Sequence, residues 1–266
     1  MQQAPVNRVK MEKIMAQKKK TKAMVVSQEK LADGIYDLRL ETELAQDAAC
    51  GQFVGVYPKD KSTLLPRPIS ICEIDKEKNQ LRLVYRVAGK GTAEFSNLKT
   101  GDSVYLLGVL GNGFPVDKAK PGTKAMLFGG GIGVPPILQL SKELSCEKQI
   151  VVGYRNAQCF LKEDFEQNGA VYVATEDGSV GTKGNVMDAV AANGLEADII
   201  YACGPMPMLR AIRQYAIEHD IPAYISLEER MACGIGACLA CVCNSKEKDA
   251  HSNVKNKRIC KEGPVF

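Results

Sequence analysis

Cysteines near the C-terminal end have the spacing of an iron–sulfur ligand set. The segment from residue 233 to 241 follows the pattern C-x4-C-x2-C, and a further cysteine stands at position 260. This is the plant-type [2Fe–2S] spacing. Gly234 and Gly236 let the backbone wrap around a cluster and direct N–H groups at its sulfur atoms. The expected ligands are Cys233, Cys238, Cys241 and Cys260.

Two other interpretations of these cysteines remain open. Zinc ribbons usually contain two C-x2-C pairs, whereas here one pair is split by four residues and the last cysteine stands alone. A zinc-held interaction module is therefore an alternative of another functional class, and free thiols are a further one. Cys243 could replace Cys241 as the third ligand, although the x2 spacing favours Cys241.

A glycine-rich segment is placed to bind phosphate. Residues 129–136, GGGIGVPP, follow an apolar strand and open a helix, so that backbone N–H groups and the helix N-terminus can meet a pyrophosphate. Pro136 stands where a Rossmann motif has its third glycine, and a plain strand-to-helix turn is the alternative. Cys203-Gly204 closes another strand, where open α/β sheets bind ligands, although a cysteine there is often simply buried.

Two short motifs in the first half of the chain could bind a second cofactor. Arg67-Pro68-Ile69-Ser70 offers a cation and a hydroxyl for phosphate and ring hydrogen bonds. Gly89-Lys90-Gly91-Thr92 is a small-residue loop at the head of a possible helix. Each motif alone could equally be a solvated loop.

The elements that position these motifs change type along the chain. Residues 24–120 contain short strands separated by turns, which predicts an antiparallel β-barrel. Residues 121–227 alternate strands with helices, which predicts a doubly wound parallel α/β domain. Residues 228–266 are cysteine-rich with little periodicity, which is typical of a small cluster domain. The expected fold class is therefore a multidomain α+β protein.

Composition and charge exclude several classes of protein. The chain has 266 residues, ten cysteines, two histidines and a net charge of +4. Residues 1–24 hold seven basic side chains and one acidic, so the other 242 residues sum to −2 and a nucleic-acid partner is not expected. Residues 1–23 are predicted to be a disordered basic extension. The absence of a long apolar run or signal peptide favours a cytoplasmic protein without a membrane span.

Taken in order, the motifs resemble those of the ferredoxin-NADP reductase superfamily. An iron–sulfur tail after such a reductase is similar to the family of electron-transfer subunits of NAD-dependent dihydroorotate dehydrogenase B. The resemblance runs from about residue 22 to the end. Its specific matches are residues 67–70, residues 229–238 and the ending Gly263-Pro264-Val265-Phe266. Ile69 departs from the Tyr or Phe found in many superfamily members.

The resemblance implies three cofactors and a partner. NAD would lie across Gly131, Gly133, Cys203 and Gly204. In the family, an FMN-containing catalytic subunit oxidises dihydroorotate for pyrimidine (UMP) synthesis, and electrons pass from FMN through [2Fe–2S] and FAD to NAD, in a heterotetramer with two of each subunit. The residues implied for FAD are Arg67, Pro68, Ile69, Ser70, Val84, Tyr85, Arg86, Gly91 and Thr92.

One enzyme alternative shares every cofactor motif. It is the flavin and iron–sulfur subunit of a hydrogenase or of a ferredoxin–NAD(P)H oxidoreductase. The ending Gly263-Pro264-Val265-Phe266 speaks against it. The choice of NAD over NADP comes from the resemblance, because no residue can be placed as a reader of the 2′ position.

Overall fold

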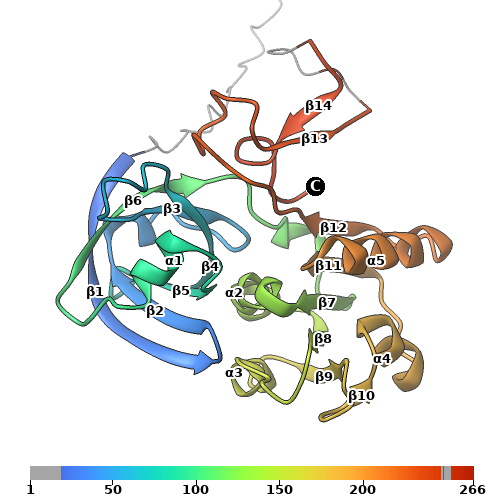
Figure 1. Ribbon diagram of the computed structural model, residues 1–266. Coiled ribbons are helices and arrows are strands. Elements are labelled where there is room, and N and C mark those ends of the chain that lie inside the picture. The colour runs from blue at the N-terminus through green and yellow to red at the C-terminus, as the bar shows by residue number, and fades with distance from the viewer. Residues whose placement is uncertain (1–18, 247, 249–252) are drawn as a thin grey trace, which may run out of the picture.

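The computed structural model describes residues 19–246, 248 and 253–266, which form a barrel, an α/β sheet and a small C-terminal part (Figure 1). The barrel is closed and antiparallel, in the order β1-β2-β5-β4-β3-β6. One short helix, α1 (Lys90–Phe95), follows β5. The strands are β1 (Lys19–Ala32), β2 (Ile35–Glu41), β3 (Phe53–Tyr57), β4 (Arg67–Asp75), β5 (Gln80–Arg86) and β6 (Ser103–Leu110).

Alternating apolar residues explain why these strands close on one another. Successive side chains of a strand point to opposite faces, so residues two apart share a face. Leu81 and Leu83 on β5, and Leu38 and Leu40 on β2, are 0 to 1% exposed and fill the barrel with Leu106. The pattern thus buries one face of each strand inside the barrel.

The barrel begins earlier than expected. Residues 1–18 of the predicted extension lie outside the described residues, but Lys19–Ala23 belong to β1 and pair with β6. The Lys20 ammonium lies 4.3 Å from the ring centroid of Tyr57. The polar character of this segment indicated a disordered tail. Pairing with β6 and the cation–π contact of Lys20 instead hold it in the barrel.

The second part is a six-stranded parallel sheet in the order β10-β9-β8-β7-β11-β12. Helices α2 and α3 cover the face toward the barrel, and α4 and α5 cover the other (Figure 1). Its strands are β7 (Lys124–Gly130), β8 (Glu147–Tyr154), β9 (Ala170–Thr175), β10 (Thr182–Lys183), β11 (Ile199–Cys203) and β12 (Ala223–Ser226). Its helices are α2 (Pro135–Glu143), α3 (Lys162–Glu166), α4 (Val186–Asn193) and α5 (Met206–Glu218).

The strand order creates a place for a ligand. The chain builds the sheet outward from β7 in one direction through β8, then returns to add β11 on the other side. The point where the order reverses is where open α/β sheets bind nucleotides. The glycine-rich segment leaves β7 at this point and opens α2, as predicted.

The C-terminal part is held between the two others. It contains the antiparallel pair β13 (Val242–Asn244) and β14 (Asn256–Arg258). The last residues return to the sheet, where the Phe266 N–H donates to the Ile225 carbonyl at 3.0 Å and the Leu227 N–H donates to Pro264 at 2.9 Å. The Asn112 N–H, just after the barrel, donates to the Gly263 carbonyl at 2.7 Å.

The expected fold class is confirmed by this architecture. Barrel, doubly wound sheet and C-terminal part occur in the predicted order. No helix within the described part of the chain is long and apolar enough to span a membrane.

Candidate functional site

The residues expected to bind FAD surround one cavity at the end of the barrel. The cavity has a volume of about 290 Å³. β4 and β5 are paired neighbours, which brings their two motifs together. The lining includes Arg67, Pro68, Ile69, Ser70, Val84, Tyr85, Arg86 and Thr92, eight of the nine expected residues.

The ninth residue, Gly91, lies against this cavity's main cation. A Cβ at Gly91 would stand 2.8 Å from Arg67 Nε, so only glycine admits the guanidinium at this distance. The Thr92 hydroxyl accepts hydrogen bonds from the N–H groups of Ala88 and Gly89 at 2.9 and 3.2 Å, which shapes the turn before α1. Arg67 and the first-turn N–H groups of α1 therefore form one positive edge of the cavity.

Tyr85 contributes to the cavity mainly through its backbone. Its side chain is 2% exposed, stacks on Tyr36 and donates a hydrogen bond to Gln28 inside the barrel. Burial, with the neighbouring Tyr36, raises the pKa of Tyr85, so the phenol stays protonated. Val84 is equally buried, whereas Arg86 is exposed.

A second cavity of about 710 Å³ lies at the switch point of the sheet. Gly131 and Gly133 line it from the segment before α2, and Gly204 lines it from the turn after β11. The two turns pack closely, because a Cβ at Gly133 would stand 2.5 Å from the Cys203 carbonyl. Close backbone approach thus requires glycine at position 133.

Cys203 is placed differently from its neighbours. Its side chain is 1% exposed and lies in the core that the barrel and the sheet share. Burial raises the pKa of the Cys203 thiol to about 12, despite a hydrogen bond with Ser226. The Cys203 side chain thus packs in the core beneath the turn that Gly204 begins, and its expected contact with NAD stays a prediction.

The two cavities meet at residues that line both. These are Arg86 from β5, Ile132 from the glycine-rich segment and Glu228, two residues after β12. Burial raises the pKa of the Glu228 carboxyl, and the charge of Arg86 opposes part of that rise. Glu228 was not among the site residues expected from the sequence. Its position just after the last parallel strand was the available signal, because ligands gather at these strand ends.

The far end of the larger cavity carries charges of both signs. Arg155 follows β8 and Glu176 follows β9, and both line the cavity together with Asn185 at the start of α4. No motif in the sequence singles out these three residues. Only the sheet order places the ends of β8 and β9 side by side.

The four expected cluster ligands meet as two pairs of thiols. The Sγ atoms of Cys233 and Cys238 are 3.3 Å apart. Cys241 and Cys260 are buried and hydrogen-bonded to one another. Within the described residues, no three His, Cys, Asp or Glu side chains converge as a lone metal ion would need. Two pairs suit a [2Fe–2S] cluster, in which each of two irons takes two thiolates.

Backbone donors around the first pair favour thiolate. The N–H groups of Cys238 and Ile235 point at Cys233 Sγ, at 3.3 and 3.5 Å. Although burial raises its pKa, these hydrogen bonds bring the pKa of Cys233 down to about 6. Gly234 and Gly236 have φ values of +68° and +82°, so the predicted need for glycine in this loop is confirmed.

The second pair lies deeper, and Cys243 packs against the buried group that contains it. Burial, with the hydrogen bond that the Cys260 thiol donates to Cys241, raises the pKa of Cys260 to about 12. Cys243 lies on β13, and its sulfur accepts a hydrogen bond from the Lys257 N–H of β14. Cys243 is thus engaged in the strand pair, and the choice of Cys241 over Cys243 as the third ligand stays a prediction.

Arg258 holds the cluster loop against the strand pair. Its side chain is 3% exposed and forms an ion pair with Glu262 at 2.7 Å. It also donates to the Gly236 carbonyl at 3.0 Å. A buried cation thereby fixes the loop between the first two cysteines, and sequence analysis did not identify it.

Comparisons with known proteins agree with this geometry. Residues 228–266 match the family model described as the iron-sulfur cluster binding domain of dihydroorotate dehydrogenase B. Residues 127–214 match the oxidoreductase NAD-binding domain. Among solved structures, the NADH-dependent reduced ferredoxin-NADP oxidoreductase aligns with a TM-score of 0.81 at 28% identity, over 92% of this chain and 87% of that one.

A more distant structure shares the fold alone. The ferredoxin NADP+ reductase from Neisseria gonorrhoeae, solved with FAD and NADP, aligns with a TM-score of 0.63 at 13% identity, over 75% of this chain and 91% of that one.

Curated relatives match nearly the whole chain. The dihydroorotate dehydrogenase B (NAD(+)) electron transfer subunit of Lysinibacillus sphaericus is 46% identical, over 92% of this chain and 95% of its own length. The subunit of the same name from Bacillus caldolyticus is 45% identical, over 91% and 94%. The sequence identity with these relatives, together with the two cavities and the cysteine pairs, shows that the chain belongs to the family of dihydroorotate dehydrogenase B electron transfer subunits.

Proposed function

We propose that this chain conducts electrons from a dihydroorotate-oxidising partner to NAD+. The observation that carries the proposal is the order in which the three sites lie next to one another in space. Phe53 lines the smaller cavity and packs in one buried group with Cys241 and Cys260. Arg86 and Glu228 line the smaller and the larger cavity together. The flavin site therefore lies between the cluster ligands and the nucleotide site.

This order suits the chemistry of the cofactors. When bound, the cluster passes single electrons, NAD accepts a hydride, and FAD exchanges with both. Arg67 and the N-terminal N–H groups of α1 would hold the FAD pyrophosphate. Gly131 and Gly133, at the start of α2, would hold that of NAD. Arg86 and Glu228 line both cavities where these meet, and we call this place the cofactor junction. There the two side chains would orient the flavin ring and the nicotinamide ring.

The substrate site is assigned to the partner subunit. Dihydroorotate is a carboxylate anion, and a third cavity in the described part of the chain is lined by four acidic side chains and one basic side chain, Lys76, so it is poorly suited to an anion. Those four are Glu73, Asp75, Glu77 and Glu143. Ile235 and Leu239, beside the cluster cysteines, are 43% and 48% exposed. We infer that this exposed cluster face meets an FMN-containing catalytic subunit.

The finer features of the assembly follow from the family likeness. We infer a heterotetramer with two copies of each subunit, which acts in the cytoplasm in pyrimidine (UMP) synthesis. We also assign residues 19–120, the barrel with its observed start, to FAD, residues 121–227 to NAD and residues 228–266 to the cluster. A neighbouring gene for the catalytic subunit would support the partner.

The direct test is reconstitution with the catalytic subunit. The co-purified complex is expected to reduce NAD+ when given dihydroorotate, with about two irons, one FAD and one FMN per copy of this chain. A zinc-loaded chain without a visible chromophore would refute the proposal. A complex that reduces NAD+ with ferredoxin but not with dihydroorotate would reassign the substrate.

Two cysteine variants test the electron path. Cys260→Ser is expected to lose the iron, to keep the flavin and to lose dihydroorotate-dependent NAD+ reduction, while NADH still reduces its flavin. Cys243→Ser is the matched control and should keep all three properties, because its sulfur is engaged with β14. Unchanged iron in Cys260→Ser would contradict the ligand assignment.

A further inference from the structure

A network of charged side chains joins the barrel to the α/β domain. Its centre is Arg82 on β5, whose side chain is only 7% exposed. Within the barrel, the guanidinium pairs with Asp37 on β2 at 2.9 Å and with Glu73 on β4 at 3.1 Å. It also pairs with Asp164 on α3, across the domain boundary, at 2.8 Å. Arg82 is thus shared between the two domains.

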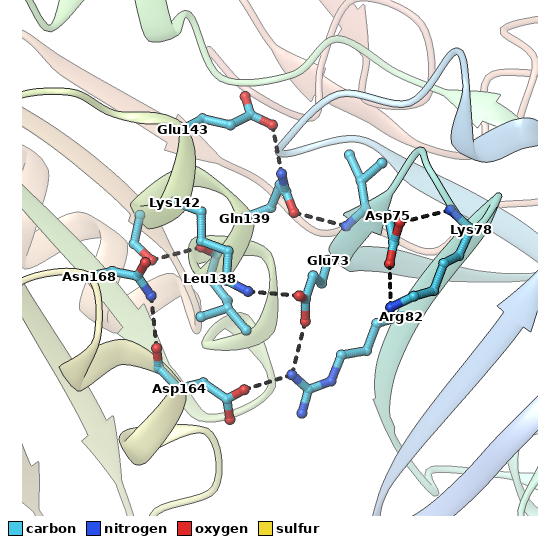
Figure 2. A network of polar contacts seen from close by, with 12 residues as sticks. Glu73, Asp75, Lys78, Arg82, Leu138, Gln139, Lys142, Glu143, Asp164 and Asn168 are labelled. Carbon is cyan, nitrogen blue, oxygen red and sulfur yellow. Dashed lines mark hydrogen bonds and ion pairs between the residues drawn. The ribbon is translucent and has the colours of Figure 1, made fainter.

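Two more contacts cross the same boundary, both from α2 (Figure 2). The Lys142 ammonium pairs with Glu73 at 2.7 Å. The Ile74 N–H of β4 donates to the Gln139 side-chain oxygen at 2.8 Å. We call the set of Glu73, Arg82, Gln139, Lys142 and Asp164, with the Ile74 N–H, the interdomain network. It fixes α2 and α3 of one domain against β4 and β5 of the other.

Each of the two main elements of this network leads to the cofactor junction. β5 continues from Arg82 to Arg86, which lines both cavities. The segment that contains Ile132, which also lines both, opens α2, the helix that carries Gln139 and Lys142. The network therefore lies at one end of two elements whose other ends form the junction.

In this arrangement, a small rotation at the interdomain network displaces the residues at the cofactor junction. Arg82 and Arg86 are four residue steps apart on β5, or about 13 Å, so a tilt of about 10° at the network moves the far end by about 2 Å. Misplacement of reacting groups by about 1 Å can slow a reaction about 100-fold. Small changes in domain angle would therefore change the rate of hydride transfer.

Apolar packing alone would join the domains without fixing their angle. The shared apolar core around α2 is stabilised by the hydrophobic effect, which depends on the buried area and has no preferred direction. A guanidinium that pairs with three carboxylates is satisfied in few orientations. Buried ion pairs are a weak source of stability, and orientation is the better account of this network.

We infer that the interdomain network positions flavin and nicotinamide relative to one another, with Asp164 and Lys142 as positioning residues on the nucleotide side. The inference rests on the proposed function, because it requires hydride exchange between FAD and NAD at the junction. Neither residue lines the two cofactor cavities. They act through the elements that do.

The structure offers a variant that removes the carboxylate charge from this link, and so weakens it, without leaving a bare buried charge. In Asp164→Asn, Arg82 keeps Asp37 and Glu73 within its own domain. The Asp164 side chain is 36% exposed, so the replacement amide can be hydrated. Glu166→Gln is the matched control. Glu166 lies on the same short helix, and its ion pair with Lys162 stays within that helix.

The test measures flavin reduction and NADH binding separately on the FAD-loaded chain. In Asp164→Asn, the rate constant of flavin reduction at saturating NADH is expected to fall at least about tenfold. The Kd for NADH and the flavin content should stay within about twofold of wild type, since neither cavity is altered. Asp164→Glu should restore part of the rate, and Glu166→Gln should match wild type.

A second readout needs no cofactor. Hydrogen exchange of the Ile74 amide reports the link to Gln139 directly. This exchange should speed up in the apo form of Asp164→Asn and stay unchanged in Glu166→Gln. Lys142→Gln breaks a different link of the same network and should give the same two effects, so it decides the question if Asp164→Asn does not fold.

Several results would overturn the inference. A reduction rate within twofold of Glu166→Gln would show that the network does not set the junction. Losses of NADH affinity, flavin and thermal stability in parallel would show a merely structural role. A wild-type chain that binds FAD but is not reduced by NADH would instead refute the proposed function, and the inference would fall with it.

Discussion

Gly133 offers the sharpest test of the nucleotide site. A Cβ at this position would stand 2.5 Å from the Cys203 carbonyl and 2.5 Å from the Gly204 nitrogen. These are backbone atoms at the end of β11, which cannot rotate away as a side chain can. Ordinary contacts begin near 3.5 Å, so Gly133→Ala must separate the two turns by about 1 Å.

The size of the effect follows from this displacement. A shift of about 1 Å in a positioned group can cost about 100-fold in rate, which corresponds to about 2.7 kcal/mol. We expect the rate of flavin reduction by NADH in Gly133→Ala to fall by about this factor, with weaker NADH binding. Overpacking should also lower the free energy of unfolding by about 1 to 3 kcal/mol. Flavin and iron content should be unchanged, because Gly133 does not line the smaller cavity.

The assay is stopped-flow flavin reduction over a range of NADH concentrations, with thermal unfolding alongside. Gly122→Ala serves as the control, because Gly122 has a φ of +88° and open space around its Cβ direction. It should lose about 1 kcal/mol of stability and keep wild-type reduction by NADH. If Gly133→Ala reduces its flavin within threefold of wild type, the close packing of the two turns does not shape the nucleotide site.

Three further variants test the other sites. Arg67→Leu should weaken FAD binding at least about tenfold by loss of the phosphate cation, with iron content unchanged, as the flavin-to-iron ratio after dialysis would show. Arg258→Gln, which loses the Glu262 ion pair, should shed iron faster under a chelator than wild type, since the loop at Gly236 is no longer held. Burial raises the pKa of Glu73, but hydrogen bonds from Lys142 and Arg82 outweigh this effect and hold the pKa below 4.5. The ionised Glu73 carboxylate therefore stabilises the fold above pH 4.5. This stabilisation is lost as the pH falls through the lowered pKa. Glu73→Gln should therefore be less stable than wild type near neutral pH, and the difference should shrink in acid unfolding titrations.

Local patterns determined the elements and most of their order. Alternating apolar residues on β2 and β5 predicted a barrel because a strand exposes residues two apart to one face. The glycine-rich segment predicted the strand-to-helix turn, and Pro135 and Pro136 fit the first turn of α2. These signals are readable because they depend on neighbours a few residues away.

The four expected cluster ligands could be proposed from spacing, since three of them lie within one loop. The pairing of the thiols was not, because Cys260 reaches Cys241 only through the fold of the last 39 residues. The start of β1 was misjudged for a similar reason. Lys19–Ala23 look like a polar tail, and only pairing with β6 makes them a strand.

Sequence alone therefore determined the cofactor classes, the domain order and the residues in local motifs. The tertiary structure decided which residues meet between domains: Glu228 at the junction, Arg155 beside Glu176, and Asp164 against Arg82. The physical reason is that these residues carry no local signature. A charged side chain after a strand or on a short helix is ordinary in a sequence, and it gains its role only from a partner far away along the chain.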